Sequence, residues 1–158
     1  MILPSPTRLT SEKIVLHTHK ASLDVAVRAC ATANILIRAP PDIQVSGYLV
    51  TIGAGNNVSR LEEMSVTGRW EIASALTDGV LDCNRYRRFW VRWNERNIAL
   101  GSGTIGSDNV LVEGMAQYTH TGLHQIELFV LPGPPAMWML NRDEGYKAFF
   151  LQMSTIFP

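Results

Sequence analysis

Residues 86–93 read YRRFWVRW, and this stretch decides the fold class of the chain. Every second position, Phe89, Val91 and Trp93, carries a large apolar side chain. Because successive side chains of a β-strand point to opposite faces, we expect these three to face the core and Trp90 to face the other way. A short turn, NER, and a second strand, NIAL, follow directly. The stretch therefore predicts a β-hairpin that buries one face.

Short alternating runs of the same kind fill most of the chain, with turn residues between them. The other candidate strands are 13–18, 23–28, 34–38, 47–52, 58–64, 69–75, 110–115 and 125–131. Eight to ten strands at close spacing are typical of a sandwich or barrel. We expect an all-β domain, an antiparallel β-sandwich of jelly-roll type.

The organisation along the chain follows from two breaks in this pattern. We expect an N-terminal tail over 1–12, the sandwich over 13–131, and a proline-rich linker with an apolar extension over 132–158. Within the extension, 143–153 predicts one short helix. The apolar side chains of the extension suggest packing on the sandwich or on another copy of the chain, as in a homo-oligomer.

Composition excludes some function classes. The chain has 14 basic and 14 acidic residues, and this balance argues against a nucleic-acid binder. No run reaches the roughly 18 apolar residues of a membrane helix. The first ten residues lack a secretory apolar region, so the chain stays inside the cell, has lost its signal, or is part of a longer protein.

The two cysteines leave two alternatives open. Cys30 and Cys83 could pair, closing a loop of about fifty residues worth ~4 kcal/mol on the entropy model. They could equally be buried free thiols. The chain has no CxxC motif, so we expect no structural zinc site.

The chain shows no catalytic or metal-binding constellation. Its four histidines fall into two pairs without a third ligand at diagnostic spacing, so exposed or hydrogen-bonded imidazoles are expected and no metal. The carboxylates considered as catalytic acids are Asp82, Glu62, Glu63 and Asp108. No two of them have a spacing that indicates shared catalysis, and we interpret them as solvated groups in turns and at strand ends.

Two glycine-rich runs resemble cofactor-binding motifs. Residues 101–106 (GSGTIG) match G-x-G-x-x-G, and 48–55 (YLVTIGAG) are similar to the first motif of S-adenosylmethionine-dependent methyltransferases. Both motifs need a helix after the glycines, and the sequence after each run reads as a strand. We therefore interpret both as turns between strands, with glycines supplying positive φ, and predict no cofactor.

The stretch 84–103 resembles the hallmark of the farnesoic acid O-methyltransferase domain family, with its Tyr, Arg, Phe-Trp pair, second Trp and glycine-rich return. Residues 53–60 are similar to a glycine turn of that family, and 25–37 to its first core hairpin. Ala54 stands where the family usually has tryptophan, and Arg96 with Asn97 replaces a turn glycine. The resemblance covers about 13–131.

The resemblance implies a β-sandwich recognition module, one that occurs within larger, often secreted, animal proteins and has no recognisable methyl-donor site. It thus favours an extracellular location. We predict a non-catalytic module that binds a glycan or a protein partner, which could be anionic. The alternatives are a methyltransferase acting on a farnesoic-acid-like carboxylate, and a structural or oligomerisation domain.

Two surfaces are candidates for ligand binding. One is the glycine turn, whose amides suit hydroxyl-rich ligands, and the other is the outer face of the strongest strand, where arginines flank an aromatic ring. An alternative for the second is a structural face whose arginines pair with cross-strand acids. The candidate residues are Ala54, Gly55, Asn56, Asn57, Arg88, Trp90 and Arg92.

Overall fold

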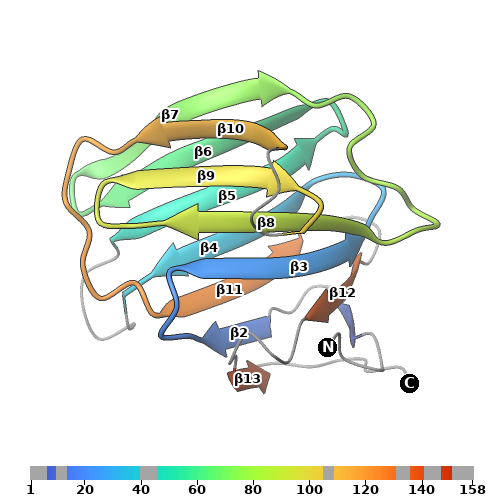
Figure 1. Ribbon diagram of the computed structural model, residues 1–158, viewed down its shortest axis with the longest axis horizontal. Coiled ribbons are helices and arrows are strands. Elements are labelled where there is room, and N and C mark those ends of the chain that lie inside the picture. Colours follow the sequence, from blue (N-terminus) through green and yellow to red (C-terminus); the bar gives the residue numbers. More distant parts are fainter. Residues whose placement is uncertain are drawn as a thin grey trace.

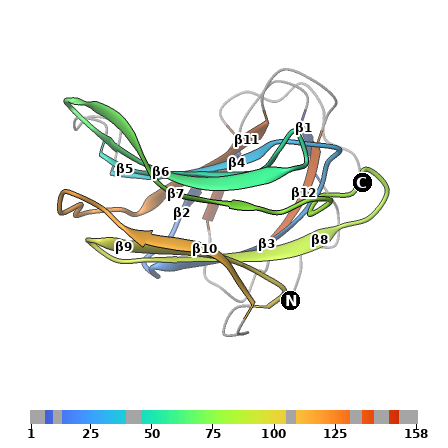
Figure 2. The same ribbon diagram turned by 90° about the horizontal axis from the view of Figure 1, so that it is seen from above.

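The computed structural model describes residues 7–9, 14–39, 46–104, 109–130, 136–140 and 147–150. Their regular elements are all β-strands, which form two antiparallel sheets packed face to face (Figures 1 and 2). The expectation of an all-β antiparallel sandwich is confirmed.

The two sheets differ in size. In spatial order, the six-stranded sheet contains β1 (Thr7–Leu9), β12 (Ala136–Leu140), β3 (Ser22–Arg28), β8 (Arg87–Trp93), β9 (Asn97–Ser102) and β10 (Val110–Met115). The seven-stranded sheet contains β13 (Lys147–Phe150), β2 (Ile14–His17), β11 (Gln125–Val130), β4 (Ala33–Arg38), β5 (Gly47–Ala54), β6 (Val58–Ser65) and β7 (Gly68–Leu76).

The C-terminal extension contributes a strand to each sheet. β12 lies between β1 and β3, and its Trp138 is buried in the core. β13 pairs with β2, so the prediction of a helix over 143–153 is wrong for Lys147–Phe150; the other residues of that range lie outside the described ones. No helix of the described residues is long and apolar enough to cross a membrane. The boundary at residue 131 and the homo-oligomer stay predictions.

The core lies between the sheets and follows the alternation of the strands. Phe89, Val91 and Trp93 are buried in it, as predicted. Trp90 belongs to the opposite face of β8 and to no part of this core, yet its side chain is fully buried too. It lies against Gly101 of the neighbouring strand, where an added Cβ would come within 2.0 Å of the indole. Glycine at that position therefore makes room for the ring.

Candidate functional site

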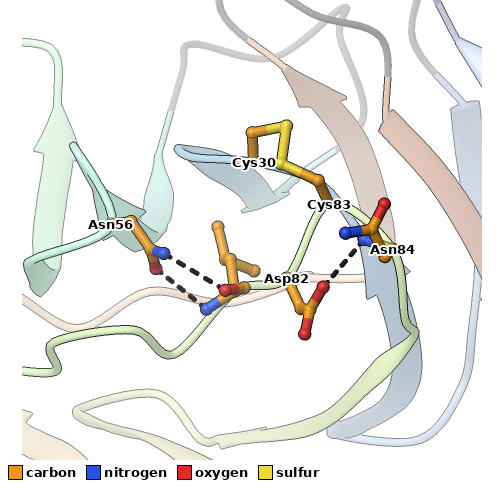
Figure 3. The surroundings of a disulfide bond; sticks show 6 residues. Cys30, Asn56, Asp82, Cys83 and Asn84 are labelled. Carbon is orange, nitrogen blue, oxygen red and sulfur yellow. Dashed lines mark hydrogen bonds between the residues drawn. A yellow bond between two sulfur atoms is a disulfide. The ribbon is translucent and has the colours of Figure 1, made fainter.

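The first candidate surface, the turn Ala54–Asn57, is occupied by internal hydrogen bonds. The side chain of Asn56 bonds the backbone of Leu81 twice: Nδ2 donates to its carbonyl at 3.1 Å, and Oδ1 accepts from its N–H at 2.9 Å (Figure 3). The N–H of Gly55 donates to Thr32 Oγ1 at 3.2 Å. Asn57 is exposed, so it keeps an amide open to solvent.

The same end of the sandwich carries a disulfide. Cys30, just after β3, bonds Cys83, and this settles the alternative that the sequence left open (Figure 3). Asn56 and the disulfide thus fasten one segment, which runs from Leu81 to Cys83, to two different turns. Gly55 and Asn56 adopt positive φ of 60° and 54°, as the turn requires. This geometry makes the turn a structural joint; ligand binding there stays a prediction.

The second candidate surface divides into residues with different roles. Arg88 Nη2 lies 2.9 Å from Oδ2 of Asp24 on the neighbouring strand β3, so it forms the cross-strand pair of the structural alternative. Trp90 is 0% exposed and offers no face to a ligand. Its ring instead supports Arg92, whose guanidinium carbon lies 4.5 Å from the ring centroid. Arg92 is exposed, and it is the member of the three that faces an open hollow.

Arg92 and Glu113 flank that hollow, which we call the arginine hollow. Strand register places both residues opposite Ala99 of β9, Arg92 from β8 and Glu113 from β10. Two strand spacings separate their backbones by roughly 10 Å. The small Ala99 forms the floor between them, and the hollow has a volume of about 480 Å³. Among the described residues, neither charged group has an ion-pair partner, so both can reach a ligand.

Two further hollows lie near the arginine hollow, at the end of the sandwich that carries the β8–β9 connection. The histidine hollow, about 280 Å³, is lined by His19, Lys20 and His124 among others. The tyrosine hollow, about 430 Å³, includes Tyr118 and the hydroxyl groups of five serines and threonines in its lining. Figure 1 shows that the β8–β9 connection at this end and the β5–β6 turn lie at opposite ends of the sheets. The two candidate surfaces of the sequence are therefore not brought together.

A buried carboxylate holds the loops around these hollows. Glu63, on β6, is 1% exposed and accepts hydrogen bonds from the N–H groups of Gln117 at 2.8 Å and Tyr118 at 2.9 Å. His120 Nε2 lies 2.8 Å from the same carboxylate, and its Nδ1 lies 2.6 Å from Ser46 Oγ. Burial acts to raise the pKa of Glu63, but these hydrogen bonds outweigh it and hold the pKa below its usual value. The expectation that Glu63 is a solvated strand-end group is wrong.

Tyr48 completes this network from the neighbouring strand β5. Its hydroxyl donates to the carbonyl of Asn94 at 3.1 Å, and its ring packs edge-on against His120, 5.2 Å between centroids. Burial first, and the charge of Glu63 second, raise the pKa of Tyr48 to about 12, so its hydroxyl keeps its proton. A serine, an imidazole and a carboxylate in one row also occur in hydrolases. Here we interpret the row as an anchor, because the imidazole of His120 is 1% exposed and the carboxylate also binds two loop N–H groups.

The family model for farnesoic acid O-methyl transferase matches residues 9–121. The chain belongs to this family. The match covers the glycine turn and both strands of the β8–β9 hairpin, so the resemblance expected from the sequence is confirmed. No curated protein sequence matches the chain.

Solved structures with the same fold have low sequence identity to this chain. The carbohydrate-binding module CBM66 from Bacillus subtilis has a TM-score of 0.50 at 12% identity, over 89% of this chain and 86% of its own. The galectin LEC-6 from Caenorhabditis elegans has a TM-score of 0.53 at 11%, over 88% and 94%. A structure described as a native glycosidic hydrolase has 0.55 at 9%, over 87% and 76%. These likenesses establish the β-sandwich.

Proposed function

We propose that this domain is a non-catalytic recognition module that binds a carbohydrate at the arginine hollow. The observation that carries this proposal is the row of Arg92, Ala99 and Glu113 across three adjacent strands. A sugar hydroxyl both donates and accepts hydrogen bonds. The guanidinium supplies only donors and the carboxylate only acceptors, so the two flanks of the hollow serve both halves of that chemistry.

The position of the charges supports a polyhydroxylated ligand over a simple anion. Glu113 would repel an anion held by Arg92, whereas sugar hydroxyls can use both groups. The cation–π contact with Trp90 fixes the guanidinium before any ligand arrives, which lowers the entropic cost of binding. Met115, which is 62% exposed, adds apolar surface beside the charges, as the apolar face of a sugar ring requires.

The fold supports the same proposal. Two structures with this fold are described as a carbohydrate-binding module and a galectin. Since fold alone does not establish function, the residues of the hollow carry the argument.

The family description would favour methyl transfer instead. Gly53 and Gly55 lead into strand β6, however, and the next described element after 101–104 is strand β10. Neither glycine run opens a helix of the described residues, and a helix N-terminus is what such cofactor motifs use. No geometric observation therefore favours this alternative.

A glycan array screened with the wild-type domain tests the proposal. Arg92→Ala and Glu113→Gln should each lose at least tenfold in affinity for whichever glycan binds, in proteins whose melting curves show that they are folded; a small drop in melting temperature is expected for Arg92→Ala, which uncovers Trp90. Arg85→Ala is the matched control, since Arg85 is an exposed arginine away from the hollow. Glycan binding that survives both site variants would refute this site.

Calorimetry with S-adenosylmethionine provides the complementary test. We expect no binding heat. Micromolar binding that Gly55→Val abolishes in a protein that stays folded would overturn the proposal and support the methyltransferase.

A further inference from the structure

The three hollows share their walls. Trp93 and Asn94 line both the arginine hollow and the histidine hollow. His120, Thr121 and Gly122 line both the histidine hollow and the tyrosine hollow. The hollows therefore adjoin one another in a series from the outer face of the six-stranded sheet, across the end of the sandwich, to the β6–β7 turn. Each hollow is near or within the roughly 300–1,000 Å³ of small-ligand sites.

Each hollow also offers groups that suit a sugar residue. In the tyrosine hollow, Tyr118 is 48% exposed, and Trp70 of β7 lies beside it with 5.8 Å between ring centroids. An aromatic ring with a polar tip can pack against the apolar face of a sugar. In the histidine hollow, the rings of His19 and His124 lie 5.9 Å apart and present nitrogen atoms that donate or accept.

Hydrogen bonds within the domain hold the loops around the hollows in place before any ligand binds. Glu63 binds the backbone of Gln117 and Tyr118, and the N–H of His120 donates to the carbonyl of Glu95 at 2.8 Å. The loops after β8 and β10 are thereby tied to each other and to β6. A fixed groove loses little entropy when a ligand binds, so contacts added along it increase affinity.

We propose that the three hollows are consecutive subsites of one groove, which takes an oligosaccharide chain of at least three sugar residues. This inference rests on the proposed function and specifies its ligand class as a chain rather than a single terminal sugar. The arginine hollow holds one residue of the chain by its hydroxyl groups. The tyrosine hollow stacks another at the far end, and the histidine hollow spans the two.

The experiment uses oligosaccharide ladders of one to six residues, neutral and acidic, immobilised on one array and followed by calorimetry on the best ladder. Wild-type affinity should rise at least tenfold between the disaccharide and the tetrasaccharide. Tyr118→Ala should remove this gain with length and leave the affinity for the short ligand. Tyr118→Phe keeps the ring and should keep most of the gain.

Leu76→Ala is the matched control, because Leu76 is 77% exposed and lines none of the three hollows. Equal affinity for all lengths, or a Tyr118→Ala variant that keeps the gain, would overturn the groove and leave the proposed function standing. Failure of every ladder member to bind would overturn both. Melting temperatures of the variants confirm that each is folded before binding is compared.

Discussion

Replacing Glu63 with glutamine removes a buried charge and keeps the shape of the side chain. The carboxylate Oε1 accepts from the N–H of Gln117, and Oε2 accepts from the N–H of Tyr118 and from His120. Glutamine has one acceptor oxygen, so its NH₂ group must face one of these donors. One buried donor without a partner costs about 1–3 kcal/mol, and losing the charge weakens the other bonds. We expect a loss of about 2–4 kcal/mol in the free energy of unfolding.

Glu62→Gln is the matched control for this perturbation. Glu62 is the adjacent residue on β6, and its carboxylate pairs with Arg69, a side chain that is 60% exposed, at 3.0 Å. The Glu62 side chain is itself 16% exposed, so the pair lies at the surface, where ion pairs contribute about 0–1 kcal/mol. Urea unfolding at pH 7, with the disulfide intact and tryptophan fluorescence as the signal, should separate the two variants clearly.

Acid provides a second readout for Glu63. Burial tends to raise the pKa of Glu63. The hydrogen bonds from Gln117, Tyr118 and His120 together lower it by more than burial raises it, so the folded pKa lies below the usual value. The contribution of the Glu63 charge to the free energy of unfolding is therefore complete above the unfolded pKa of about 4.3, and it is lost as the pH falls through the folded pKa. The difference in the free energy of unfolding between wild type and Glu63→Gln should be largest at pH 7 and should shrink towards pH 3. The interpretation of Glu63 as an anchor would be refuted if Glu63→Gln and Glu62→Gln lost equal stability, or if the difference between wild type and Glu63→Gln persisted at pH 3.

Three further outcomes follow from packing and cross-linking. Trp90→Ala should cost about 3–5 kcal/mol in urea unfolding, because the indole is fully buried; a loss much smaller than that of Trp93→Ala would contradict this. Gly101→Ala should lower the melting temperature by several degrees, since its Cβ meets the indole, and an unchanged melting temperature would contradict the contact. Reducing the Cys30–Cys83 disulfide should cost about 4 kcal/mol, measured by urea unfolding with and without reductant.

The sequence predicted the core well, because alternation in a strand depends on neighbouring residues alone. The same alternation also carries a signal for Glu63. Ser59, Leu61 and Glu63 occupy one buried face of β6, while the residues between them are partly exposed. We nevertheless expected a solvated carboxylate, since an unpaired acid is rarely buried. Its partner His120 lies 57 residues further along the chain, and no local pattern reveals that contact.

The arginine hollow shows why half of the candidate site could not be predicted. Arg92 meets Ala99 within one hairpin, so a short turn is enough to place that pair. Glu113 reaches Ala99 only because the β9–β10 pairing contains a bulge between Val110 and Val112. With regular pairing from Val110 onward, Val112 would stand opposite Ala99, and Glu113 would turn to the core face. One extra residue therefore buries Val112 and brings a carboxylate beside Arg92, and a pattern of alternating residues contains no sign of it.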